Sequence, residues 1–402
     1  MRAYERFLKY VQYDTASDEN SPSCPSTAKQ LVLANALAEE LKSLGVADAR
    51  VDEHGYVYGS IPANDESRPA IGLIAHMDVV DCVPSAPVKP AVIENYDGGP
   101  VRLANGDILD PKLFPEVAGA KGKSLIVTDG NTSLGADDKA GVAEIMTLVE
   151  TLRDHPEAPH GRVCIGFTPD EEIGRGADLF DVKGFGAEFA YTVDGGAVGG
   201  ISYENFNAAS GEVVVHGRSV HPGSAKNIML NASLIAMEFA SMLPPQQRPE
   251  HTEGYEGFFH LNGMQGQEEQ ATLNYIIRDH DRTRFEARKE QFQDIAAYLN
   301  GKYGAGTVEA EVKDSYYNMR EMVEDRMDII TRAEDAYRTA GIEPFHEAIR
   351  GGTDGSRLSY MGLPCPNIAT GGMNFHGRFE CIAIEDMDSM TDVIVRILCP
   401  GA

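Results

Sequence analysis

An apolar run ends in consecutive carboxylates in the sequence Gly166-Phe167-Thr168-Pro169-Asp170-Glu171-Glu172-Ile173-Gly174. The apolar residues 163–167 predict a short buried strand. In an open α/β sheet, ligands bind at the carboxyl ends of the strands. Two adjacent carboxylates at such a place can divide their work, since one can bind a cation while the other moves a proton. The alternative is the acidic first turn of a helix, which the helix dipole favours.

Other strand-like runs also end in polar residues. One run leads into His76-Met77-Asp78, and another leads into Asp194-Gly195-Gly196. Helical patterns alternate with these runs, which is typical of a parallel sheet covered by helices. A strand is predicted at residues 56–60, and the four predicted strands that lead into polar residues cover 70–75, 124–128, 163–167 and 189–193.

The pattern changes near residue 206, where strands and helices follow in the order β-α-β-β-α-β. We therefore expect an α/β protein with a mixed, mainly parallel sheet covered by helices and an inserted, smaller two-layer α/β lid domain. The predicted catalytic domain is discontinuous and covers residues 1–206 and 316–402, and the predicted lid covers 207–315. Residues 81–122 are rich in Pro, Gly and Asn, so we expect a long excursion there.

The composition argues against two classes of partner. The chain has 402 residues and a formal net charge of -27, which disfavours nucleic acid and anionic membranes. Its six cysteines are scattered without a C-x-x-C pair, which favours reduced thiols. The N-terminus carries no apolar signal region, and no apolar run reaches membrane-spanning length. We expect a soluble cytoplasmic protein.

His76 and Asp78 are candidates for a metal site. Side chains two positions apart on a strand share a face, and a carboxylate that orients a metal-bound histidine is a recurrent arrangement. A polar loop with no function is the alternative. Asp137, in Gly135-Ala136-Asp137-Asp138-Lys139, could bridge two cations about 3.5–4 Å apart. The alternative is a helix N-cap, for which Asp is preferred.

Two further candidates have equally simple alternatives. Asp194 could be a metal ligand or a turn residue. His376 lies in the Gly-rich sequence Gly371-Gly372-Met373-Asn374-Phe375-His376-Gly377 and could be a ligand or a free surface histidine. From the residues alone, the bridging role stays open between Asp137 and Asp138.

The order and spacing of these motifs resemble the peptidase T family, the tripeptide aminopeptidase branch of the dizinc aminoacylase and peptidase clan. The resemblance covers nearly the whole chain. Its most specific parts are Tyr316-Tyr317-Asn318-Met319-Arg320 and Arg350-Gly351-Gly352-Thr353-Asp354-Gly355.

The resemblance implies a site with two Zn²⁺ ions, for which Co²⁺ or Mn²⁺ could substitute. One ion would take His76, Asp194 and the bridging Asp137, and the other would take Asp137, Glu172 and His376. Glu171 would accept a proton from the metal-bridging water and pass it to the leaving amine. Asp78 would hold His76 in position.

The resemblance also implies the groups that bind substrate. His221 would polarise the scissile carbonyl, and Arg278 and Arg350 would bind the C-terminal carboxylate or main chain of the peptide. The alternatives are a capping histidine and structural ion pairs. We expect a monomeric or homodimeric zinc aminopeptidase that releases the N-terminal residue of tripeptides. A dipeptidase or N-acyl-amino-acid deacylase of the same clan, and a non-catalytic peptide- or metal-binding protein, are the competing hypotheses.

Overall fold

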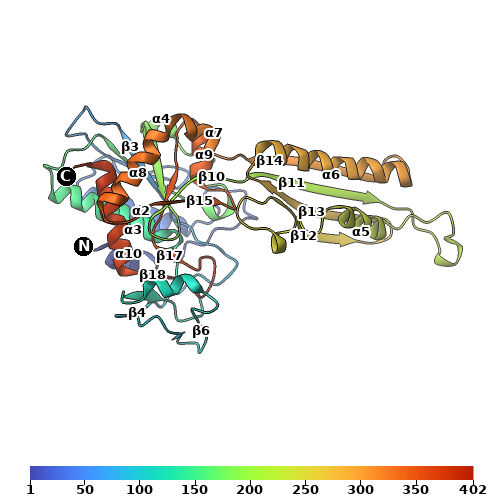
Figure 1. Cartoon of the computed structure of the whole chain (residues 1–402), viewed down its shortest axis with the longest axis horizontal. Coiled ribbons are helices and arrows are strands. Elements are labelled where there is room, and N and C mark those ends of the chain that lie inside the picture. The colour runs from blue at the N-terminus through green and yellow to red at the C-terminus, as the bar shows by residue number, and fades with distance from the viewer. Residues whose placement is uncertain (402) are drawn as a thin grey trace. The chain divides into compact units, whose positions relative to one another are not determined.

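The computed structural model describes residues 1–401, and the chain divides into two compact units (Figure 1). The first unit contains Met1–Tyr203, Glu321–Glu347 and the chain from Thr353 onward. The second unit contains Glu204–Arg320 and the short segment Ala348–Gly352.

An eight-stranded mixed sheet forms the centre of the first unit, in the order β1-β2-β8-β3-β9-β16-β10-β15. Its central strands β8, β3, β9 and β16 pair in parallel, while β1, β2 and β10 add antiparallel pairs toward the two edges. The predicted α/β class is confirmed. The strands are β1 (Arg50–Val51), β2 (Val57–Ile61), β3 (Ile71–His76), β8 (Val163–Thr168), β9 (Phe189–Val193), β16 (Asn367–Ile368), β10 (Gly200–Asn205) and β15 (Phe345–Ile349).

Helices cover both faces of this sheet. The main core joins one face to α1, α2, α3, α8 and α10, and a smaller core joins the other face to α4 and α9. The helix α10 buries Met387, Met390, Ile394 and Ile397, a spacing that places them on one helical face. The helices are α1 (Ala3–Tyr10), α2 (Gln30–Ser43), α3 (Ala136–Asp154), α4 (Val182–Phe185), α7 (Arg320–Val323), α8 (Met327–Thr339), α9 (Asp354–Tyr360) and α10 (Ile384–Leu398).

The excursion predicted at residues 81–122 contributes to a second small sheet of order β17-β18-β7-β4. A separate core of Tyr96, Leu103, Leu109 and Val117 lies against it. The segment therefore has its own packing although its strands are very short. The excursion contains β4 (Ala91–Ile93) and a separate two-stranded sheet of β5 (Val101–Arg102) and β6 (Ile108–Leu109). The other strands of the small sheet are β7 (Leu125–Val127), β17 (Gly372–Met373) and β18 (Cys381–Ala383).

The second unit has two layers, as predicted. An antiparallel sheet of order β12-β13-β11-β14 buries alternate residues against α5 and α6, which contact one another (Figure 1). The elements are β11 (Asn207–His216), α5 (Ala232–Met242), β12 (Phe258–Gly266), β13 (Gln270–Asp279), α6 (Arg282–Tyr303) and β14 (Val308–Tyr316).

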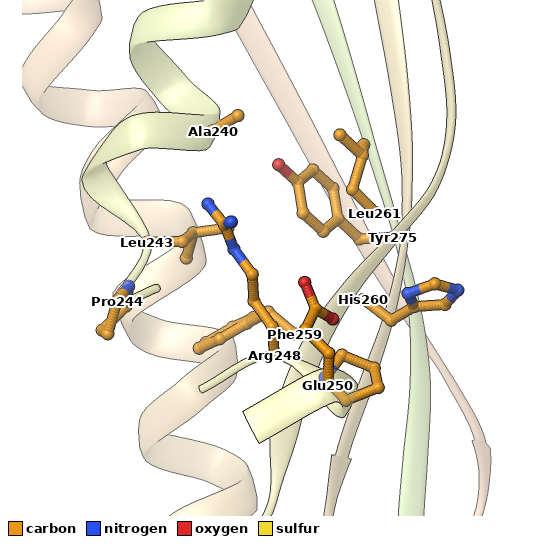
Figure 2. Close-up of a pocket in the computed structure, with 10 residues that line it drawn as sticks. Ala240, Leu243, Pro244, Arg248, Glu250, Phe259, His260, Leu261 and Tyr275 are labelled. Carbon is orange, nitrogen blue, oxygen red and sulfur yellow. The ribbon is translucent and has the colours of Figure 1, made fainter. Parts of the chain in front are cut away.

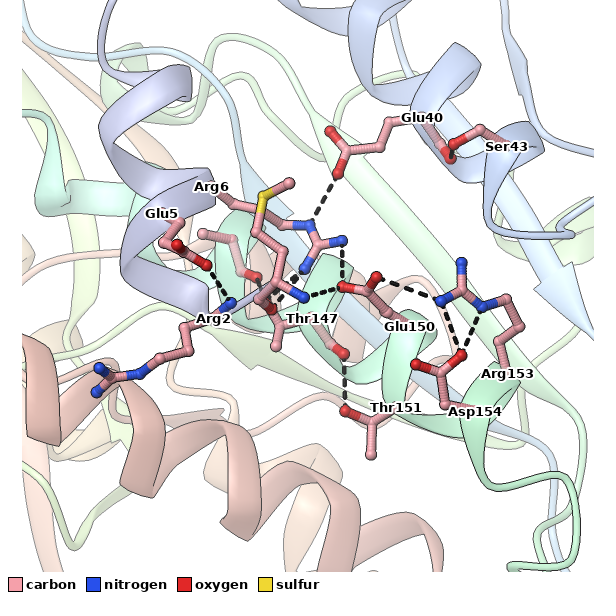
Figure 3. Close-up of polar contacts among 12 residues, drawn as sticks. Arg2, Glu5, Arg6, Glu40, Ser43, Thr147, Glu150, Thr151, Arg153 and Asp154 are labelled. Atoms are coloured by element: carbon pink, nitrogen blue, oxygen red, sulfur yellow. Dashed lines mark hydrogen bonds and ion pairs between the residues drawn. The ribbon is translucent and has the colours of Figure 1, made fainter.

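Arg6 ties the N-terminal helix to the main core (Figure 3). Its side chain is only 2% exposed and donates to Glu40 and Glu150 at 2.8 Å each and to Thr147 Oγ1 at 3.1 Å. A guanidinium in this position needs partners, because an unpaired charge is costly to bury. The ion pairs join α1 to α2 and α3.

In residues 1–401, no helix combines the length and the apolar character that crossing a membrane requires.

Candidate active site

Parallel pairing brings the carboxyl ends of three strands together. His76, the last residue of β3, is in register with Thr168, the last residue of β8. The strand β9 lies on the other side of β3 and leads directly into Asp194. The acidic sequence after β8 therefore begins beside His76, with Glu171 and Glu172 in a short 3-10 helix.

Five side chains form two groups that share Asp137, and they come from these strand ends, from the start of α3 and from the loop before β18. His76 Nε2 lies 2.9 Å from Asp137 Oδ1 and 4.0 Å from Asp194 Oδ1. His376 Nε2 lies 3.0 Å from both Asp137 Oδ2 and Glu172 Oε2. The two oxygens of Asp137 thus face two different histidines. This is the arrangement that a bridging carboxylate between two cations requires.

Asp78 contacts both His76 and the backbone of the acidic sequence. It is fully buried, and its Oδ1 lies 3.4 Å from His76 Nδ1. The same carboxylate accepts hydrogen bonds from the backbone N–H groups of Glu171 at 3.0 Å and Glu172 at 3.2 Å. The backbone carbonyl oxygen of Asp78 also lies within hydrogen-bond distance of His76 Nδ1, at 3.1 Å. Asp78 therefore holds the histidine through its main chain and its carboxylate, and its carboxylate holds the backbone of the two glutamates. Its contacts to these amides were not predicted.

Asp138 has a structural role that differs from that of Asp137. Its buried carboxylate accepts hydrogen bonds from the backbone N–H of His76 at 3.1 Å and of Gly141 at 3.2 Å. The chain is so close here that a side chain at Gly141 would meet Val193 O at 1.9 Å. Asp138 thus links β3 to the start of α3, while Asp137 faces the histidines.

Glu380 holds the backbone around Asp137, and sequence reasoning missed it. The residue is 2% exposed, and its carboxylate accepts from Leu134 N at 2.7 Å, Gly135 N at 2.9 Å and Asp137 N at 3.0 Å. Burial raises the pKa of Glu380 to about 7, although these hydrogen bonds oppose the shift. Nothing in the sequence around Glu380 marks it.

Asp170 also differs from expectation. The sequence predicts a local capping or turn role for Asp170, the first of the three carboxylates, but its side chain contacts residues far away in the chain. Asp170 is fully buried and accepts hydrogen bonds from Ser26 N and Gln30 Nε2 at 2.7 Å. It fixes the loop after β8 to the segment that begins α2.

The charges of the cluster are strongly coupled. Burial raises the pKa of Glu172 to about 7 and that of Asp194 to about 6. Hydrogen bonds to Asp137 and Glu172 raise the pKa of His376 to about 11. Burial opposes ionisation of Asp137, but its two histidine partners outweigh burial and lower its pKa. Protons on these groups therefore limit the charge of the cluster, and bound cations could take the place of the protons and stabilise the ionised carboxylates.

The donor set fits metal ions. Imidazole nitrogens and carboxylate oxygens are the ligands that Zn²⁺, Co²⁺ and Mn²⁺ accept. The second oxygen of Glu172 is buried and has no hydrogen-bond partner in the part of the chain that the structure describes. A buried carboxylate oxygen without a partner is costly, and a bound cation would remove that cost. The residues that can hold metal are His76, Asp137, Glu172, Asp194 and His376.

The three predicted substrate-binding residues lie in the second unit. His221 is exposed, and its Nδ1 accepts a hydrogen bond from Gly223 N at 3.1 Å. Arg278 is largely buried, donates to two backbone carbonyl oxygens and lies 5.2 Å from the centre of the Tyr316 ring. Within residues 1–401, no carboxylate pairs with Arg278, so the structural ion pair is absent.

Arg350 is engaged with its own unit. Its guanidinium donates to Thr252 Oγ1 at 3.0 Å and to the backbone carbonyls of Thr252, Gly254 and Glu256. The guanidinium also lies over the rings of Phe206 and Phe258. Arg350 therefore holds the loop 252–256, a contact that the sequence did not suggest.

Comparison with known proteins shows the family to which the chain belongs. The sequence profile of the peptidase dimerisation domain matches residues 203–307. Peptidase T of Caldanaerobacter subterraneus is 56% identical over 400 residues, which are 99% of this chain and 98% of that protein. Peptidase T of Clostridium perfringens is 55% identical over 398 residues, with the same coverage of both chains.

Solved structures share the fold. Aminopeptidase PepT from Bacillus cereus has a TM-score of 0.79 at 22% identity, covering 99% of this chain and 97% of that one. A dinuclear metal binding peptidase of the M20 family from Bacillus subtilis has a TM-score of 0.65 at 16% identity, covering 98% and 97%. The relatives define the chain as a peptidase, an enzyme that hydrolyses peptide bonds. Within that class, the chain belongs to the peptidase T family.

Proposed function

We propose that the protein is a dizinc aminopeptidase that releases the N-terminal residue of tripeptides. The observation that carries the proposal is the shared carboxylate Asp137, whose two oxygens each face a different histidine. The peptidase T relatives support the tripeptide substrate. We assign the reaction to the first unit, and we assign the role of a lid to the second.

Two divalent ions held by these ligands would acidify a shared water and polarise the peptide carbonyl. The residues of the chain then divide the remaining work. Glu171 accepts the proton of the attacking water and returns it to the leaving amine. Its carboxylate has no hydrogen-bond partner among residues 1–401, whereas Glu172 is engaged with His376. This contrast supports Glu171 as the base and Glu172 as the ligand.

Asp78 acts as a positioning residue in this mechanism. Its contact with His76 Nδ1 fixes the ring so that Nε2 faces the cluster, and its bonds to the amides of Glu171 and Glu172 fix their spacing.

The second unit supplies the proposed substrate contacts. Because His221 Nδ1 accepts a hydrogen bond, the proton of the neutral ring lies on Nε2, which can donate to a carbonyl oxygen. Arg278 lacks a carboxylate partner in the described chain and is suited to a peptide C-terminus. For Arg350, the same role requires that the guanidinium release the loop 252–256.

The test is a tripeptidase assay on the wild type and on Glu171→Gln, with metal content measured in both. We expect the variant to keep its metal and to lose turnover by about a thousandfold or more, within the range for removal of a general base. Unchanged turnover would contradict the role of Glu171. Faster cleavage of dipeptides or N-acyl amino acids than of tripeptides would contradict the substrate.

We also propose that the protein forms a homodimer and works in the cytoplasm. The dimerisation-domain match supports the first proposal, and the six separated cysteines support the second. Sedimentation analysis of the purified protein tests the dimer.

A further inference from the structure

A cavity in the second unit has the features of a separate ligand site (Figure 2). It has a volume of about 310 Å³, near the lower end of the range for small-molecule sites. Its walls come from the end of α5, from the 3-10 helix Pro249–His251 and from the strands β12 and β13. None of the residues assigned above to metal or substrate lines it.

Apolar side chains form most of the wall. Leu243 and Phe259 are buried, and Leu261 lies at the rim with 38% exposure. Figure 2 shows these side chains around one open space between α5 and the sheet. Such a wall suits an aliphatic or aromatic side chain of a ligand.

Tyr275 brings a fixed polar group to this space. The residue is 4% exposed, and its ring packs edge-on against Phe292 at 5.3 Å. Its hydroxyl points into the cavity and has no hydrogen-bond partner among residues 1–401. Burial raises the pKa of Tyr275 to about 12, so the hydroxyl keeps its proton and can donate.

Two opposite charges lie at the same opening. The guanidinium of Arg248 reaches toward Tyr275, and the carboxylate of Glu250 also points into the space (Figure 2). In the described chain neither side chain has an ion-pair or hydrogen-bond partner, and they do not pair with each other. A guanidinium suits a ligand carboxylate, and the carboxylate of Glu250 suits a ligand ammonium.

We propose that this cavity binds a small zwitterion with an apolar side chain, either a free amino acid or a dipeptide. Arg248 and the hydroxyl of Tyr275 hold the α-carboxylate, Glu250 holds the ammonium group, and the apolar wall receives the side chain. The inference does not depend on the proposed function, because every residue that it uses lies outside the metal cluster. It adds a second ligand site to a peptidase whose products carry this same chemistry.

The experiment is calorimetric titration of the metal-loaded protein with L-leucine, and in a second arm with glycyl-L-leucine. Arg248→Met is expected to weaken binding about tenfold or more, because a charge-assisted hydrogen bond is lost. Tyr275→Phe, which removes one oxygen from the ring, is expected to weaken it about twofold to tenfold. Arg284→Met, an exposed arginine of the same unit, is the matched control and is expected to bind as the wild type does.

L-Leucinamide and N-acetyl-L-leucine separate the two charges. Each is expected to bind about tenfold more weakly than L-leucine, since each lacks one charge of the zwitterion. The ligand that binds more tightly, L-leucine or glycyl-L-leucine, shows whether the cavity is suited to a free amino acid or to a dipeptide.

Equal affinities of the wild type, Arg248→Met and Tyr275→Phe for both ligands would overturn the proposal. So would a change of oligomeric state in these variants without a change in ligand affinity, because the cavity would then belong to an interface between two copies of the chain. Resistance to trypsin and thermal unfolding verify that each variant is folded. If Arg248→Met does not fold, the affinity of Tyr275→Phe decides the outcome.

Discussion

Replacement of Glu380 by Gln tests how the chain positions the shared carboxylate. A carboxamide has the shape of the carboxylate but offers only one accepting oxygen. Glu380 serves Asp137 N with one oxygen and Leu134 N and Gly135 N with the other. In either orientation of the Gln amide, its NH₂ group therefore faces at least one backbone N–H from which it cannot accept a hydrogen bond.

The expected magnitude follows from these contacts. Loss of one hydrogen bond to an ionised acceptor, together with one buried N–H left unpaired, lowers the free energy of unfolding by about 2–4 kcal/mol. The backbone of Asp137 shifts as a result, and its carboxylate no longer meets both histidines. Loss of such a supporting contact weakens metal binding by roughly 10–100-fold.

The assay is competition for Zn²⁺ against a chromophoric chelator. It should be run above pH 7, where Glu380 is ionised. Denaturant unfolding is measured in parallel, and Glu116→Gln, an exposed glutamate of the same unit, is the control. A variant that is destabilised as expected but binds Zn²⁺ with wild-type affinity would refute the positioning argument.

Three other outcomes are expected. Arg6→Met is expected to lower the free energy of unfolding by about 2–4 kcal/mol, which urea unfolding measures. The loss is smaller than for a fully buried ion pair, because the side chains of Glu40 and Glu150 stay 27% and 20% exposed. Glu144→Gln is expected to stabilise the protein at about pH 8 but not at about pH 4. Burial raises the pKa of this unpartnered carboxyl, so the folded protein keeps a proton that the unfolded chain releases. The free energy of unfolding of the wild type therefore falls by about 1.4 kcal/mol for each pH unit above the pKa of Glu144 in the unfolded chain. Equal effects at both pH values would contradict it. Chelation of bound metal abolishes tripeptide turnover and lowers the unfolding temperature, since a ligand at 100 times its Kd contributes about 2.7 kcal/mol, and calorimetry with and without chelator checks this.

Local patterns predicted the strands that carry the site. The apolar runs before His76, Glu171 and Asp194 are continuous, because strands buried on both faces have no polar alternation. The structure places β3, β8 and β9 there, with shifts of about one residue at their ends. The grouping of the five metal-ligand candidates came from the family resemblance, since no local pattern joins residues so far apart in the chain.

Contacts between distant segments could not be predicted from the sequence. Glu380 has no periodic or motif signal, and its role exists only because β18 folds back against the loop that precedes α3. Asp170 reaches Ser26, and Arg350 reaches the loop 252–256, for the same reason. The short strands of the excursion escaped prediction because two or three residues are too few to show alternation.

One carboxylate, Asp78, contacts His76 and the backbone amides of Glu171 and Glu172, the proposed proton acceptor and the proposed metal ligand. Thermal displacement of the loop after β8 therefore moves Glu171 and Glu172 together with the carboxylate that anchors His76. We therefore expect the distance between Glu171 and His76 to vary less than the position of either in space. Such correlated motion would let this partly buried loop carry precise chemistry without being rigid. A substitution at this single buried position is therefore expected to disturb the proposed acid–base function and the proposed metal binding together.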